Sequence, residues 1–130
     1  MHAVDTNVIV RLFARDNAAQ TAAALRALTT DLIFVPKTVV MEFEWVLRGV
    51  YGEPRQTILA AMETILATAN VEVEDVAAVE RAIDWFRHGM DFADALHLAS
   101  SGHADAFVSF DIAMRRRTAA LGIEPPVVAP

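Results

Sequence analysis

The sequence contains no cysteine and no long uninterrupted hydrophobic stretch. The first absence excludes a disulfide framework, a thiol nucleophile, a zinc ribbon and an iron–sulfur cluster. The second argues against a transmembrane helix, which needs about 18 consecutive apolar residues. The N-terminal residues also lack the basic segment followed by a hydrophobic one that marks a secretory leader. These absences predict a soluble, cytoplasmic protein that does not bind a membrane.

Histidine and lysine are scarce as well. The four histidines show no HExxH or other paired metal-ligand spacing, so oxygen ligands are expected for any bound metal. Lys37 is the only lysine, and the other ten basic residues are arginine. The 17 acidic and 11 basic residues give a net charge of −6, which argues against a surface that binds nucleic acid everywhere. A local cluster of basic side chains remains compatible with this net charge.

The chain has 130 residues, of which 55% are hydrophobic, so a single domain over residues 1–130 with a sizeable core is expected. Short apolar segments alternate with helical patterns along the whole chain. This alternation predicts a parallel sheet with helices on both faces. The strands are expected to end near residue 5, to span residues 32–36, 71–73 and 106–110, and to include an edge strand at 127–128.

Helices are predicted after the first strand and over residues 18–28, 39–50, 54–69, 75–87, 91–102 and 111–121. Thr38 is a plausible N-cap for the helix over residues 39–50. Within that helix, Val39 and Val46 are expected to draw Glu42 toward the apolar side. Glu44 has Arg48 four residues later, which is the spacing of a solvent-exposed ion pair.

Carboxylates follow several of the predicted strands. Asp5 and Asp111 stand at strand ends, where sites form in parallel α/β sheets. Asp91 and Asp94 share one face at the start of a helix. Asp5, Asp91 and Asp111 also occupy positions at which aspartate simply caps a helix, and this alternative stays open for each of them. Glu42 adds a fourth, half-buried acidic position.

Clustered carboxylates repel one another and do not all stay ionised near neutral pH without a cation. Mg²⁺ or Mn²⁺ is the natural complement, because both prefer oxygen ligands and bind substrate phosphates. Such a metal can polarise water and stabilise the leaving oxygen of a phosphodiester.

Four segments together resemble a PIN domain, and specifically a VapC-type toxin ribonuclease. They are VDTNVIVRL at residues 4–12, Glu42, DFADAL at 91–96 and SFD at 109–111. The resemblance implies a three-layer α/β/α sandwich with a parallel sheet of four or five strands. It also implies endonucleolytic cleavage of RNA, a homodimer and neutralisation by a VapB-type antitoxin.

By the same resemblance, four acids would be catalytic and hold the metal: Asp5, Glu42, Asp94 and Asp111. Four further residues would support them: Thr6, Asn7, Asp91 and Ser109. The family often has threonine where this chain has Ser109, and the hydroxyl is retained.

A net-acidic nuclease still needs arginines near its carboxylates to attract RNA. The candidates are Arg11, Arg15 and the three consecutive arginines 115–117, of which Arg115 is the one predicted to bind RNA. Consecutive helical residues point in different directions, so only one or two arginines of that run can face one phosphate tract. Trp45, Trp85, Phe86 and Phe92 are expected to serve packing rather than base stacking.

Other functions are considered beside this one. A receiver-like phosphoacceptor domain is also a small parallel α/β unit with aspartates around Mg²⁺, but it needs a lysine after a late strand, and Lys37 precedes a central helix. A housekeeping PIN-like nuclease would share the site without an antitoxin. A catalytically silent PIN-like binding module is disfavoured by the full set of acids.

Overall fold

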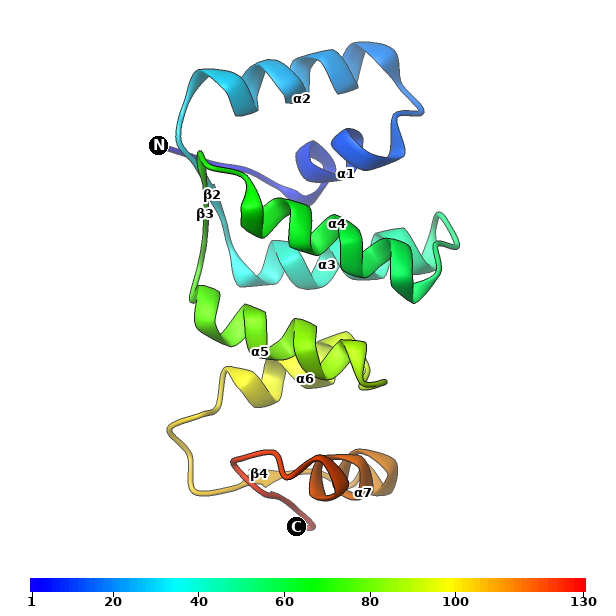
Figure 1. Cartoon of the computed structure of the whole chain (residues 1–130), viewed down its shortest axis with the longest axis vertical. Helices are drawn as coiled ribbons and strands as arrows, with labels where there is room; N and C mark the ends of the chain where they lie inside the picture. Colours follow the sequence, from blue (N-terminus) through cyan, green and yellow to red (C-terminus); the bar gives the residue numbers. More distant parts are fainter. The chain divides into compact units, whose positions relative to one another are not determined.

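A computed structural model describes residues 1–130 as two compact units, Met1–Val79 and Glu80–Pro130 (Figure 1). Helix α5 (Val76–Arg87) contains the boundary between them. The single domain expected over the whole chain stays a prediction. None of the helices combines the length and the apolar character that crossing a membrane requires.

The first unit holds a three-stranded parallel sheet with strand order β1-β2-β3. Strand β2 is central and pairs His2 with Ile33 on one side and Ile33 with Val71 on the other. Helices connect the strands, as parallel pairing requires. The elements are β1 (His2–Ala3), α1 (Thr6–Ala14), α2 (Ala18–Thr30), β2 (Ile33–Val35), α3 (Lys37–Gly49), α4 (Arg55–Ala67) and β3 (Val71–Val73).

The core of this unit forms where α1, α3 and α4 bury their apolar faces. Helix α1 packs against α2 and α3, and α3 packs against α4. The ring of Phe13 meets the fully buried ring of Phe43 edge to face, with centroids 5.3 Å apart. Ile33 and Val35 of the central strand are each 1% exposed, so the face of β2 that carries them is buried.

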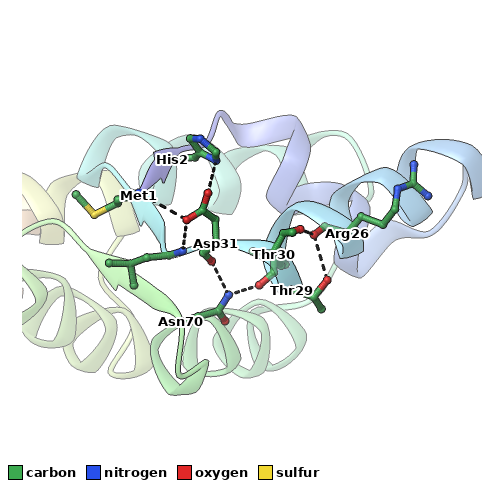
Figure 2. A network of polar contacts seen from close by, with 9 residues as sticks. Met1, His2, Arg26, Thr29, Thr30, Asp31 and Asn70 are labelled. Carbon is green, nitrogen blue, oxygen red and sulfur yellow. Dashed lines mark hydrogen bonds and ion pairs between the residues drawn. The ribbon is translucent and has the colours of Figure 1, made fainter.

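A polar network ties the chain start to the end of α2 and the start of β3 (Figure 2). The Asp31 carboxylate lies 3.1 Å from His2 Nδ1 and 3.7 Å from the Met1 amino group. Asn70 donates to the carbonyl oxygens of Asp31, at 2.9 Å, and of Leu28. These contacts satisfy carbonyls at the end of α2, where the helix itself provides no donors.

The second unit contains the rest of α5, then α6 (Phe92–Ala99), β4 (Phe107–Val108), α7 (Ile112–Leu121) and β5 (Val127–Val128). Strands β4 and β5 form a separate parallel pair, with Phe107 opposite Val127. Phe86 of α5 packs edge to face on Phe92 of α6, with centroids 5.6 Å apart. Arg81 donates to the Ala99 carbonyl at 3.0 Å and closes the same interface between α5 and α6.

The α/β fold class with parallel strands is confirmed. The predicted sheet of four or five strands differs, because the five strands form a ladder of three and a ladder of two. The segment 106–110 forms a strand only at Phe107–Val108, and this strand pairs with the equally short β5.

The expected N-cap of α3 is wrong. The helix begins at Lys37 with Pro36 in the capping position, so Thr38 lies inside the first turn. The first amide of the helix is satisfied from a distant segment, since the Lys37 N–H donates to Glu74 Oε2 at 2.8 Å. The Lys37 ammonium also lies 3.1 Å from the carboxylate of Asp75, next to Glu74. A contact with a distant segment therefore replaces the local cap that was expected from the Thr38 hydroxyl.

Candidate functional site

One open pocket in the second unit is lined by three carboxylates. Asp91, Asp94 and Asp111 reach it from the N-terminal ends of α6 and α7. Its volume is about 170 Å³, and its remaining lining residues are Met90, Ala113, Met114 and Arg117. Three of the predicted acidic residues therefore share one cavity.

Helix capping holds two of these carboxylates in place. Asp91 is the N-cap of α6 and accepts a hydrogen bond from the Asp94 amide at 3.1 Å. Asp111 is the N-cap of α7 and accepts from the Met114 amide at 2.9 Å. The Ser109 hydroxyl in turn accepts from the Asp111 amide at 3.0 Å. The capping role considered from the sequence is thus real for both aspartates, and capping also directs them to the pocket.

Electrostatics single out Asp94 within the pocket. Partial burial raises the pKa of Asp94, and the negative charges of Asp91 and Asp111 raise it further, while His97 acts in the opposite direction. The ionised form of Asp94 is therefore disfavoured until a positive charge joins the pocket. A cation would reverse this balance.

Replacing Asp94 by asparagine is expected to raise the thermal stability of the metal-free protein at neutral pH. The raised pKa means that the protonated carboxyl suits the fold, and this advantage is lost as pH rises through the folded-state pKa. Asparagine stays neutral and avoids the penalty. The gain should be largest near pH 7 and vanish below the ordinary aspartate pKa of about 3.9.

Melting curves in EDTA from pH 3 to 8 would measure this difference, with Asp105→Asn as the matched control. Asp105 is an exposed aspartate of the same unit and does not line the pocket. A lower melting temperature for Asp94→Asn at pH 7 would contradict the electrostatic description of the pocket.

Arg117 is the basic residue that the structure places at this pocket. Its guanidinium donates to the Gly89 carbonyl, and Gly89 has φ +100 at the turn before α6. Arg115, selected from the sequence, instead donates to the Ser109 carbonyl at 2.8 Å. Helical spacing was the sequence signal that could have pointed to Arg117, since Ala113, Met114 and Arg117 share one face of α7.

Asp5 and Glu42 belong to the first unit. Asp5 is the exposed N-cap of α1 and accepts from the Val8 amide at 3.2 Å. Thr6 beside it is buried, and Asn7 is exposed. The roles of Asp5, Glu42, Thr6 and Asn7 at a metal stay predictions.

The expected burial of the two glutamates in α3 is reversed. Glu42 is exposed, whereas Glu44 is only 3% exposed. The buried positions of the helix are Val40, Phe43, Glu44 and Leu47, so the apolar side is centred away from Val39 and Val46. The predicted pairing is confirmed, because Arg48 Nε lies 2.8 Å from Glu44 Oε1. The pair neutralises a carboxylate inside the core rather than on the surface.

Arg11 and Arg15, the other predicted RNA-binding residues, make contacts within the first unit. Arg11 forms an ion pair with Asp16 and donates to the Tyr51 hydroxyl at 3.3 Å, and that hydroxyl donates to Asp16 at 3.0 Å. These hydrogen bonds, first from Tyr51 and then from Arg11, lower the pKa of Asp16. Arg15 follows α1 and donates to the Leu12 carbonyl at 3.3 Å. Phosphate binding by Arg11 and Arg15 stays a prediction.

The donor set of the pocket suits a hard divalent cation, although across residues 1–130 no three His, Asp or Glu side chains are arranged to hold a metal ion. Carboxylate oxygens are the ligands that Mg²⁺ and Mn²⁺ prefer. The mutual repulsion that raises the pKa of Asp94 is what such a cation would relieve.

The fold and the pocket define a parallel α/β protein with acidic side chains gathered at helix N-termini. The family model described as PIN domain matches residues 3–119, and the chain belongs to this family. PIN domains are typically nucleases and generally use divalent metal ions. No curated protein and no solved structure matches the chain.

Proposed function

We propose that this protein is an endoribonuclease that depends on Mg²⁺ or Mn²⁺. The observation that carries the proposal is the single pocket lined by Asp91, Asp94 and Asp111 in a chain of the PIN family. Membership of that family favours a nuclease over the receiver-like alternative. A bound divalent cation would supply charge stabilisation to a phosphodiester during hydrolysis.

Each residue at the site has a role in this proposal. Asp94 and Asp111 would hold the metal from the pocket that they line, and the family resemblance implies metal-binding roles for Asp5 and Glu42 as well. Asp91 and the Ser109 hydroxyl keep the two helix starts in position through hydrogen bonds at 3.1 and 3.0 Å. Arg117 offers a fixed positive charge at the edge of the pocket, where it can orient a substrate phosphate.

The finer proposal is a toxin of a type II toxin–antitoxin module, active as a homodimer and neutralised by a VapB-type antitoxin. The motif resemblance supports it, and so does an apolar pocket of about 380 Å³ in the first unit. Side chains of α1, α2 and α4 line that pocket, among them Leu12, Leu25 and Ile65. An apolar antitoxin segment could occupy it. A housekeeping nuclease of the same fold would need no such partner.

The nuclease is tested by removing and restoring metal. Purified protein incubated with RNA should produce no cleavage in excess EDTA and regain cleavage when Mg²⁺ or Mn²⁺ is added, because unneutralised carboxylates repel the substrate phosphate. Sequencing the new RNA ends would show whether cleavage is endonucleolytic. Full cleavage in EDTA would contradict the metal-dependent mechanism.

Growth of the host despite induced expression would favour the housekeeping nuclease over the toxin.

A further inference from the structure

The junction between β4 and α7 exposes three large apolar side chains. Phe110 is 86% exposed, Val108 59% and Ile112 55%. Phe110 is the most exposed of the large hydrophobic side chains in the chain. We call Val108, Phe110 and Ile112 the apolar junction. A phenylalanine ring left in water forgoes the free energy that burial of its apolar surface would provide, so this ring is a candidate contact for a binding partner.

The backbone on both sides of Phe110 is held by hydrogen bonds. The Ser109 amide donates to the Val128 carbonyl at 2.9 Å, and the Ser109 carbonyl accepts from Arg115 at 2.8 Å. On the other side, the Asp111 amide donates to the Ser109 hydroxyl, and the Asp111 carboxylate caps α7. The ring is thus presented from a fixed backbone, which reduces the entropy lost when a ligand orders it.

The position of Phe110 in the chain connects it to the acidic pocket. The next residue, Asp111, lines that pocket, and consecutive Cα atoms lie only about 3.8 Å apart. Arg117, which also lines the pocket, and the exposed Arg116 lie on the helix that follows. An aromatic ring, a carboxylate pocket and positive charges therefore occupy one short stretch of the second unit.

We propose that Phe110, flanked by Ile112, is a stacking site for an unpaired base of the RNA whose phosphate enters the acidic pocket. This inference rests on the proposed nuclease function and adds to it a residue that binds a base of the substrate. A nucleotide offers a flat ring beside a phosphate, and this combination matches an exposed aromatic ring whose chain neighbour, Asp111, lines a carboxylate pocket together with Arg117. A purely apolar protein partner would instead desolvate the charges around Phe110 without pairing them. Bases inside a duplex are already stacked and cannot use the ring.

Binding measurements with variants of Phe110 test the stacking site. Fluorescence anisotropy with Mg²⁺ present and a labelled RNA whose backbone cannot be cleaved would give the Kd of the single strand and of the matched duplex. Phe110→Ala should weaken single-strand binding by roughly 5- to 150-fold, the range expected for one stacked base. Phe110→Trp should bind as tightly as the wild type, whereas Phe110→Leu should resemble the alanine variant despite its apolar side chain. Duplex binding should be unchanged in all three.

Leu121→Ala is the matched control, because Leu121 is 43% exposed at the opposite end of α7 and does not line the pocket. It should leave binding unchanged. Steady-state cleavage by Phe110→Ala should show a raised KM with a smaller change in kcat, as expected for a binding contact.

Equal single-strand affinity of the wild type and Phe110→Ala would overturn the stacking site, even if both proteins cleave RNA. A change of oligomeric state in Phe110→Ala, seen by light scattering with RNA affinity unchanged, would assign the apolar junction to a protein contact and also overturn it. RNA binding that depends on Phe110 in a protein that never cleaves would support the stacking site and reject the proposed nuclease. The two proposals therefore fail separately.

Discussion

Asp111→Asn is expected to slow RNA cleavage about 100-fold or more while the protein stays folded. A metal's charge stabilisation of a reacting phosphodiester is worth several kcal/mol, and each 1.4 kcal/mol or so is a factor of ten in rate. Asparagine has nearly the shape of aspartate but lacks the negative charge that attracts a cation. It is also an equally good N-cap, so the hydrogen bond from the Met114 amide to residue 111 can persist.

The retained cap makes this substitution informative, because it separates the two roles of Asp111. Cleavage rates at saturating Mg²⁺ or Mn²⁺ and circular-dichroism melts would be compared for the wild type, Asp111→Asn and the control Asp105→Asn. Loss of cleavage with an unchanged melt would assign a metal-binding role. Wild-type cleavage by the Asp111→Asn variant would leave capping as the only role of this residue.

Arg48→Ala is expected to destabilise the protein by about 2–3 kcal/mol, because it leaves the Glu44 carboxylate in the core without its charged partner. The sequence alone predicted a surface pair, for which the cost would be only a few tenths of a kcal/mol. The magnitude of the loss therefore distinguishes the two placements of Glu44.

Replacing the exposed Glu42 by glutamine should leave stability nearly unchanged while testing its proposed role at the metal.

A double-mutant cycle isolates the pair from other effects of each substitution. Urea unfolding would be measured for Arg48→Ala in the wild type and in a Glu44→Gln background, where the buried charge is gone. The cost of Arg48→Ala should shrink markedly in the second background. Arg26→Ala serves as a control, since Arg26 is an exposed arginine on α2. An equal cost in both backgrounds would show that Arg48 acts through packing rather than through Glu44.

The capping aspartates of the acidic pocket could be predicted because helix capping is a local property. An aspartate after an apolar segment and before a helical pattern both ends a strand and caps a helix, and Asp91 and Asp111 do this in the structure. Asp94 follows Asp91 by three residues, so its place on the same helix face is a consequence of helical geometry. These residues needed no knowledge of distant contacts.

The choice among neighbouring residues could not be predicted in the same way. Arg115 and Arg117 differ by two positions on one helix, and only the packing of α7 shows that Arg117 lines the pocket while Arg115 binds the Ser109 carbonyl. The amide at the start of α3 is satisfied by Glu74, which is 37 residues away in the sequence. No local pattern contains such a partner.

By itself, the sequence determined the order of strands and helices, their parallel pairing and the aspartates at the starts of α6 and α7. These features depend on periodicity, chain connection and capping, which act between residues a few positions apart. Only the tertiary structure decided that Glu44 is buried and Glu42 exposed, and that the Phe110 ring stands in water beside Asp111. The face that a helix or turn buries depends on which distant segments pack against it, and that free energy belongs to the assembled core rather than to any short stretch of the chain.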